Sequence, residues 1–204
     1  PAFQQALNHV DEEALKNPPK TLDDIKTQIA SLEFQRLLCL ANSPELWQKD
    51  RALPLKADEY LSLFGKRISG DGFKPLLNFL GFGRQRNTQK RKILWIADEA
   101  GEIVVDLAVI RLLVSHGHKV IIALKDGPLY TKADILDIRD DAVFQKVMSQ
   151  AVLIDDPRLG KNDLVRTLRS DIPILALSDG TSENLNLVLV STTFARIFKE
   201  VDGV

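Results

Sequence analysis

Acidic side chains gather where one apolar run of the sequence ends. Asp98, Glu99 and Glu102 follow the run 93–97, and Asp106 comes one helical turn after Glu102. Carboxylates placed together repel one another unless a cation or a proton lies among them. Oxygen-rich sites of this kind suit Mg²⁺ or Mn²⁺ better than zinc. The position of Asp98 directly after the run favours a functional carboxylate, whereas Glu102 is explained as well by capping of the next helix.

Polar side chains also follow three other apolar runs that are typical of strands. In chain order they are Lys125, Asp126, Thr131, Lys132 and Asp134; then Asp155, Asp156 and Arg158; then Ser178, Asp179, Thr181, Glu183, Asn184 and Asn186. Open parallel sheets bind ligands beyond the carboxyl ends of their strands. We therefore expect these side chains and Asp98 to share one edge of a sheet.

The second half of the sequence alternates short apolar runs with helical stretches. The predicted strands are 93–97, 119–124, 151–154 and 172–177. The run 93–97 is typical of a strand covered on both faces, and 119–124 predicts a second buried strand. The predicted helices between them cover about 103–114, 133–150 and 162–169. Strands that alternate with helices predict right-handed βαβ units, and therefore an α/β fold with a parallel sheet.

The first half of the sequence has a helical pattern. Thr21 is the predicted N-cap of one helix, with Asp24 three residues on as its capping-box partner. Pro44 follows another cap candidate and suits a helix start. The stretches 56–65 and 73–81 predict two short helices, each followed by a glycine.

Between the two halves the composition becomes basic. We divide the chain into a helical region 1–83, a linker 84–91 and an α/β region 92–204. The basic residues at the junction are Arg84, Arg86, Lys90, Arg91 and Lys92. A solvated connection between two domains explains these charges, and a patch that faces phosphate or nucleic acid is the alternative.

The overall composition argues against nucleic-acid-binding, membrane and zinc-thiolate proteins. The 204 residues carry a formal net charge of −1, which gives no overall attraction to nucleic acid or to an anionic membrane. Cys39 is the only cysteine, so we expect a small buried side chain and no thiolate zinc site. His116 and His118 lack zinc-type spacing. No stretch resembles a membrane span or a signal peptide, which predicts a cytoplasmic protein.

Two segments resemble a known family. "ILWIADEAGEIVVDLAVIRLL" (93–113) is similar to the Asp-Asn-Ala-Gly-Glu-Ile-Val signature of the metal-dependent damage-control phosphatase family. "KVIIALKDGPLYTKADILD" (119–137) resembles that family's Val-Val-Lys-Gly-x-Pro-Ile-x-Asn-Asp-Ala-Thr stretch. Weaker similarities at 61–69 and 185–204 extend the resemblance to about residues 61–204.

The resemblance implies a three-layer α/β/α domain with a mostly parallel sheet, preceded by a helical portion. It also implies a divalent ion, usually Mn²⁺, Co²⁺ or Ni²⁺ and alternatively Mg²⁺. The implied activity is hydrolysis of small phosphate esters, such as sugar phosphates or damaged phosphometabolites, by metal-activated water. The partner would be a small phosphorylated metabolite.

Site residues carried over from the family match only in part. Asp98 matches the first metal ligand, and Glu99 stands where the family has Asn. A gapless count from Pro128 puts Lys132 at the third ligand position, and Asp134 replaces it only if the loop shifts. Phosphate charge would be offset by Lys125, by Lys132 and by backbone N–H groups along the segment Ser178, Asp179, Gly180 and Thr181.

Two hypotheses about the function of the site stay open. The first is a metal-dependent phosphatase with Asp98 and Lys125 in the catalytic set. The second is a catalytically degenerate binding or scaffold protein on the same fold, because the Lys132 ammonium would neutralise Asp98 and Glu99 internally. The sequence ends at Val204, before the family's Lys-Gly-x-x-Asn loop, so we expect either a fragment or a compromised activity. Carboxyl methyltransfer is disfavoured because no glycine-rich cofactor loop follows the first strand.

Overall fold

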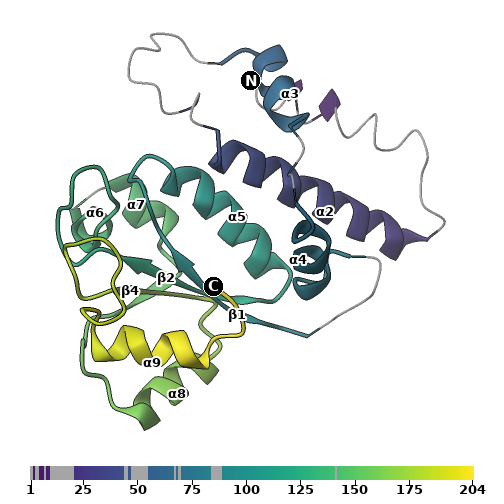
Figure 1. Ribbon diagram of the computed structural model, residues 1–204. Helices are drawn as coiled ribbons and strands as arrows, with labels where there is room; N and C mark the ends of the chain where they lie inside the picture. Colours follow the sequence, from purple (N-terminus) through teal and green to yellow (C-terminus); the bar gives the residue numbers. More distant parts are fainter. Residues whose placement is uncertain are drawn as a thin grey trace. The chain divides into compact units, whose positions relative to one another are not determined.

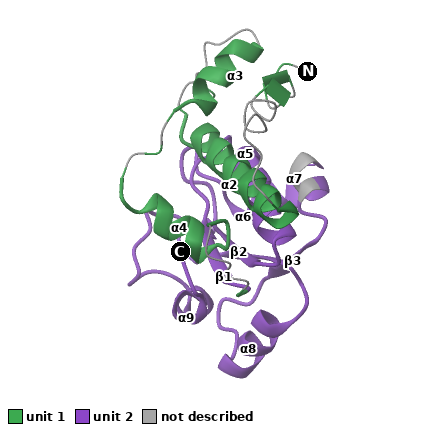
Figure 2. Cartoon of the chain, turned by 90° about the vertical axis from the view of Figure 1, so that its right-hand side faces the viewer, with its two compact units in different colours: residues 1–89 green, residues 90–204 purple. Residues whose placement is uncertain are grey.

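The computed structural model forms two compact units, residues 1–89 and 90–204 (Figure 2). It describes residues 2, 5, 6, 8, 9, 21–43, 46, 55–66, 68, 70–83, 89–140 and 142–204. The predicted helix start at Pro44, and Arg84 and Arg86 of the basic cluster, lie outside these residues. The division into a helical region, a linker and an α/β region stays a prediction.

Unit 1 is helical. Its main helices are α2 (Leu22–Ala41), α3 (Ala57–Phe64) and α4 (Phe73–Phe79). The predicted N-cap is confirmed, because the hydroxyl of Thr21 accepts a hydrogen bond from the backbone N–H of Asp24 at 3.2 Å. Phe34 of α2 packs against Phe82 with ring centroids 5.2 Å apart. Cys39 is buried as predicted, and burial raises the pKa of its thiol.

Unit 2 contains one sheet of four parallel strands, in the order β1-β2-β4-β3. The strands are β1 (Lys92–Ile96), β2 (Lys119–Leu124), β3 (Ala151–Ile154) and β4 (Ile174–Ser178). All four predicted strands are confirmed, with bounds that differ by two residues at most. The central strand β2 is buried from Val120 to Leu124, as an apolar run covered on both faces requires.

Helices cover both faces of this sheet, which gives the predicted three-layer arrangement (Figure 1). They are α5 (Ile103–Ser115), α6 (Ile135–Asp140), α7 (Ala142–Val147), α8 (Lys161–Arg169) and α9 (Thr192–Glu200). One face packs Leu164 and Leu168 of α8 and Phe194 and Ile197 of α9 against strand residues such as Leu175. Helix α5 lies on the opposite face (Figure 1). Within the described ranges, no helix is long and apolar enough to cross a membrane.

Two helical segments differ from the prediction. The single helix expected at 133–150 is divided into α6 and α7. The side-chain amide of Gln145 donates to the carbonyl oxygen of Arg139, which a continuous helix would reserve for the backbone N–H four residues on. Helix α9 was not predicted, although Ser191 is its N-cap and accepts from the N–H of Phe194 at 3.1 Å.

Candidate functional site

The segment between β2 and α6 folds back across the carboxyl ends of β1 and β2. The N–H of Ala133 donates to the carbonyl of Asp98 at 2.7 Å, and the carbonyl of Ala133 accepts from the N–H of Lys125 at 3.0 Å. Further along both segments, the N–H of Ala100 donates to the carbonyl of Thr131 at 2.8 Å. These backbone bonds bring Lys132 opposite Glu99 as a bridge partner.

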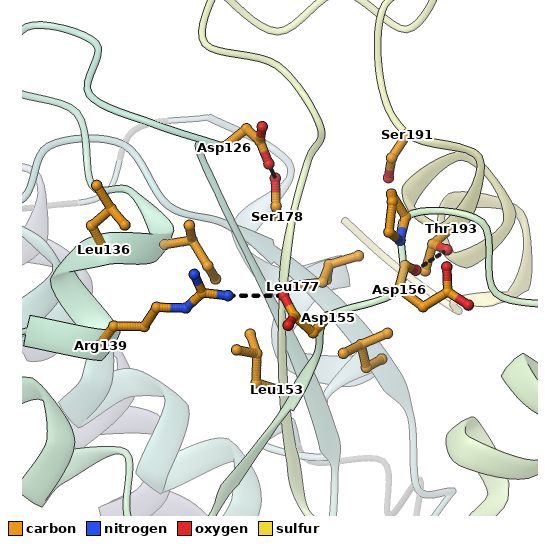
Figure 3. Close-up of a pocket in the computed structure, with 13 residues that line it drawn as sticks. Asp126, Leu136, Arg139, Leu153, Asp155, Asp156, Leu177, Ser178, Ser191 and Thr193 are labelled. Carbon is orange, nitrogen blue, oxygen red and sulfur yellow. Dashed lines mark hydrogen bonds and ion pairs between the residues drawn. The ribbon is translucent and has the colours of Figure 1, made fainter.

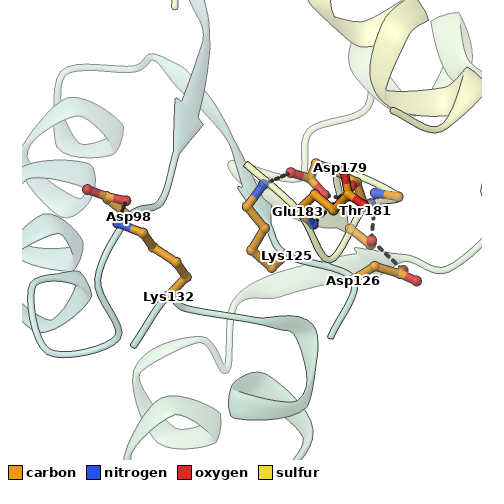
Figure 4. Close-up of polar contacts among 9 residues, drawn as sticks. Asp98, Lys125, Asp126, Lys132, Asp179, Thr181 and Glu183 are labelled. Carbon is orange, nitrogen blue, oxygen red and sulfur yellow. Dashed lines mark hydrogen bonds and ion pairs between the residues drawn. The ribbon is translucent and has the colours of Figure 1, made fainter. Parts of the chain in front are cut away.

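Lys132 binds both carboxylates that follow β1. Its Nζ lies 2.5 Å from Oδ1 of Asp98 and 2.6 Å from Oε1 of Glu99, and Figure 4 shows Lys132 pointing toward Asp98. Hydrogen bonding to these two carboxylates raises the pKa of the ammonium, and the bond from Lys132 lowers the pKa of Glu99. Lys132 therefore stays protonated and supplies a positive charge beside the two carboxylates that were predicted to be metal ligands.

Lys125 forms a separate ion pair deeper in the same edge of the sheet. Its Nζ donates to Oδ2 of Asp179 at 2.7 Å, and both side chains are buried (Figure 4). The other oxygen of Asp179 accepts from the N–H of Thr181 at 2.9 Å. The predicted catalytic residue Lys125 is thus paired with Asp179 at the end of β4, whereas the other predicted catalytic residue, Asp98, is paired with Lys132.

Asp134 caps helix α6. It is buried, and its Oδ1 accepts from the backbone N–H groups of Leu136 at 2.7 Å and Asp137 at 3.3 Å. The structure therefore places the alternative third ligand at a helix N-terminus, where a carboxylate is stabilised by the helix dipole. Its role as a metal ligand stays a prediction.

The segment expected to hold phosphate forms its hydrogen bonds internally. Ser178 Oγ donates to Oδ1 of Asp126 at 2.6 Å and accepts from the N–H of Gly180 at 2.8 Å. The N–H of Thr181 is bonded to Asp179, as described above. The N–H groups of Gly180 and Thr181 are therefore already bonded to side-chain oxygens of the protein.

The long loop after β4 is closed at its base. The N–H of Ser191 donates to the carbonyl of Asp179 at 2.8 Å. Gly180 has a φ of +83°, and a Cβ there would lie 2.6 Å from the backbone nitrogen of Ser191. Glycine is required at this position, because a side chain would clash with the backbone as well as strain its own dihedral angle.

Two acidic residues near β1 sit in less polar surroundings. The indole N–H of Trp95 donates to Oδ2 of the buried Asp106 at 3.0 Å, and burial is the main cause of the raised pKa of Asp106. Glu102 is the N-cap residue of α5, but its side chain makes no capping hydrogen bond. Burial, and then the charge of Asp98, raise the pKa of Glu102. No side-chain hydrogen bond therefore supports the prediction that Glu102 caps this helix.

A cavity of about 330 Å³ opens at the carboxyl ends of β3 and β4 (Figure 3). Its polar lining residues are Asp126, Arg139, Asp155, Asp156, Ser178, Ser191 and Thr193. Arg139 pairs with Asp155 at 2.9 Å, and the hydroxyl of Thr193 donates to the carbonyl of Asp156 at 2.7 Å. The cavity therefore presents three carboxylates, one guanidinium and three hydroxyls.

Sequence reasoning identified only part of this lining. Asp155 and Ser178 directly follow predicted strands and Asp126 comes two residues after one, whereas Arg139 and Thr193 lie within helices. The available signal for Thr193 was the N-cap pattern of "STTF" before an amphipathic stretch. Arg139 carried no such signal, because an arginine on a helix surface is common.

The sequence matches the family model described as the damage-control phosphatase ARMT1-like domain over residues 12–172, which is more than half of the chain. The chain belongs to this family. Membership confirms the resemblance to the damage-control phosphatase family that the sequence shows. A search of curated proteins found no match.

A solved structure shares the fold. It is a DUF89-family protein of Pyrococcus horikoshii, to which this chain is 18% identical with a TM-score of 0.52. The match covers 98% of this chain and 56% of that protein, so the chain spans little more than half of its neighbour's length. At this identity the likeness shows the α/β fold alone.

The residues present do not fit the divalent ion that the family implies. Among the described residues, no three His, Cys, Asp or Glu side chains are arranged to hold a metal ion. Asp98 and Glu99 share the ammonium of Lys132, which donates hydrogen bonds and cannot act as a ligand. Asp134 is directed to the N-terminus of α6. An ion would require Lys132 to leave both carboxylates.

Proposed function

We propose that this chain is a binding protein on the phosphatase fold, in which Lys132 takes the place of the ion. The observation that carries the proposal is the double contact of its Nζ with Asp98 and Glu99, at 2.5 and 2.6 Å. An ammonium supplies one positive charge and three donors, but it neither polarises a phosphoryl oxygen as a Lewis acid nor lowers the pKa of a water molecule. The site would therefore retain a ligand without hydrolysing it.

The proposed ligand is a small phosphorylated metabolite of the sugar phosphate type. The carboxylates of Asp126, Asp155 and Asp156 line the cavity at the carboxyl ends of β3 and β4 and are acceptors for hydroxyl groups. Arg139 lines the same cavity and offers the planar donors that suit a phosphate group. At about 330 Å³ the cavity lies within the size range of small-molecule sites. A cytoplasmic location stays a prediction.

The rival proposal is hydrolysis of small phosphate esters by metal-activated water. Family membership favours it, and so does the exposure of Asp98, whose side chain is 64% accessible. The ion would be Mn²⁺, or alternatively Co²⁺, Ni²⁺ or Mg²⁺. It would have to displace Lys132 before Asp98, Glu99 and the shifted Asp134 could become ligands.

A metal titration separates the two proposals. Melting temperature and p-nitrophenyl phosphate turnover are measured with increasing Mn²⁺ for the wild type, for Lys132→Asp and for Lys161→Asp. Lys161 is an exposed lysine that does not line the cavity at the carboxyl ends of β3 and β4, so it controls for the change in net charge. We expect Mn²⁺ to raise the melting temperature of Lys132→Asp only, because only that variant gains a third carboxylate beside Asp98 and Glu99. Turnover by the wild type with Mn²⁺ would overturn the binding proposal.

A second measurement tests the ligand. Calorimetric titration with a panel of sugar phosphates, in the presence of EDTA, should show binding to the wild type. Arg139→Gln should weaken it about tenfold, the usual effect of losing one charge-assisted hydrogen bond. Equal affinity of the wild type and Arg139→Gln would exclude this cavity as the binding site.

A further inference from the structure

A second cavity, of about 360 Å³, lies at the amino ends of the strands, opposite the family's site. Three segments line it, with Val114 of α5 beside them. They are residues 90–92 at the start of β1, residues 117–119 at the start of β2, and residues 168–173 from the end of α8 to the start of β4. All of these residues belong to unit 2. The cavity is therefore built by one compact unit.

The lining is strongly cationic. It contains five basic side chains, Lys90, Arg91, Lys92, Lys119 and Arg169, against one carboxylate, Asp171. Helices α5 and α8 both end beside it, and each carbonyl terminus contributes about half a negative charge. Two helix ends offset only about one of the five cations. Complementing the helix dipoles thus does not account for the whole cluster.

One of these five basic side chains, Lys119, forms hydrogen bonds to the backbone of the protein. Lys119 Nζ donates to the carbonyl oxygens of Ser170 and Ile172, both at 2.6 Å. Burial lowers the pKa of Lys119, and the nearby Asp171 opposes that shift. Lys119 therefore fixes the turn after α8, which forms one wall of the cavity.

The charges of three further cations, Lys90, Lys92 and Arg169, are available to a ligand. Within the part of the chain that the structure describes, no ion pair holds the side chain of Lys90, Lys92 or Arg169. The stem of Lys90 lies across the turn at Gly117, where a Cβ would be 3.3 Å from Cε of the lysine. His118, only 4% exposed, accepts from the N–H of Arg91 at 3.1 Å and so fixes the backbone of the basic segment.

We propose that this cavity binds a small anion that carries a diphosphate group. Cations supplied by separate segments around one cavity suit a ligand with several negative charges better than a single carboxylate. The volume of about 360 Å³ accommodates a small molecule. Free pyrophosphate and a nucleoside diphosphate share this chemistry. The proposal is independent of Lys132 and of the function proposed for the opposite edge.

The test is calorimetric titration of the whole chain with pyrophosphate and, separately, with ADP, in EDTA. We compare the wild type with Arg169→Glu and with the matched control Arg166→Glu. Both arginines lie in the last turn of α8, so the two variants change net charge and helix dipole alike, but only Arg169 lines the cavity. We expect Arg169→Glu to weaken binding at least tenfold and Arg166→Glu less than about twofold.

Lys90→Glu provides a second variant on another segment, and each variant is first checked for an unchanged melting temperature. Equal losses from Arg169→Glu and Arg166→Glu would show a diffuse charge effect and overturn the proposal. So would the absence of binding to the wild type at millimolar pyrophosphate. Tighter binding of ADP than of pyrophosphate would identify the ligand as a nucleotide, and equal binding would identify the diphosphate group alone as the recognised feature.

Discussion

Two lysines at the carboxyl edge of the sheet are held in contrasting ways. Lys125 and its partner Asp179 have side chains only 8% and 3% exposed. Lys132 is 25% exposed, and its partners Asp98 and Glu99 are 64% and 34% exposed. The first pair links the ends of two neighbouring strands inside the protein, whereas the second set lies where water and ions can reach it.

The difference separates a structural cation from a replaceable one. Removing one partner of a buried ion pair leaves the other charge desolvated and uncompensated, which is costly. Exposed pairs contribute little to stability, because water and salt screen them. Lys132 is therefore the lysine that a mutation can remove without unfolding the protein.

The largest expected effect comes from Lys125→Met. It leaves the carboxylate of Asp179 buried without its cation, so we expect a loss of about 3–5 kcal/mol in the free energy of unfolding, measured by urea denaturation. The double variant Lys125→Met/Asp179→Asn should recover part of that loss, because neither buried charge remains. A loss no larger than that of Lys132→Met would mean that burial does not distinguish the two lysines.

Lys132→Met should have a smaller effect. We expect a loss of at most about 1 kcal/mol in the free energy of unfolding, because its partners are largely exposed. The loss should shrink further in 1 M NaCl, where the Debye length is only about 3 Å. The loss caused by Lys125→Met should persist at that salt concentration. Identical salt dependence of the two losses would remove the proposed contrast.

A pH series sharpens the role of Glu99. Its pKa is lowered from the ordinary value of 4.5 by the bond from Lys132. The stability it contributes is therefore present above pH 4.5 and is lost as the pH falls through the lowered pKa. Glu99→Gln should be less stable than the wild type at pH 6, by at most about 1 kcal/mol. The two proteins should converge in acid, and a constant difference would argue against the ion pair.

The smallest expected effect is an increase in melting temperature, caused by a substitution at Asp106. The raised pKa of Asp106 means that its stabilising contribution is present below its ordinary value of 3.8 and is lost as the pH rises through the raised value. Asp106→Asn should therefore increase the melting temperature at pH 7, by about 1–3 °C, and not at pH 3. An amide oxygen still accepts from the indole of Trp95. Asp140→Asn, at an exposed carboxylate, is the control and should change little.

Much of the fold was predictable because local patterns and tertiary structure agree. The runs at 119–124 and 151–154 are bounded by polar residues and became strands with those limits. The break between α6 and α7 was not predictable, because the bond from Gln145 to the carbonyl of Arg139 depends on a side-chain conformation. Helix α9 was missed because its N-cap follows a long apolar run, 187–190, that obscured the boundary.

The candidate site was predictable as a location and less so as a set of contacts. The positions of Asp98, Lys125 and Ser178 were predictable, because each residue follows the end of a predicted strand. Sequence spacing did not predict that Lys125 pairs with Asp179, because that contact joins residues 54 positions apart through the strand order. The cap formed by Asp134 was open to recognition, since an aspartate before a helical stretch is a common N-cap.

The closure of the loop after β4 has a consequence for sequence change. The bond from Ser191 to Asp179 fixes both ends of the excursion 181–190, and residues 182–189 within it are exposed. Lengthening a flexible excursion with anchored ends adds only a slowly growing entropic penalty, about 0.6 kcal/mol for each doubling in length. This part of the molecule is thus free to diversify between relatives while the sheet beneath it keeps its register.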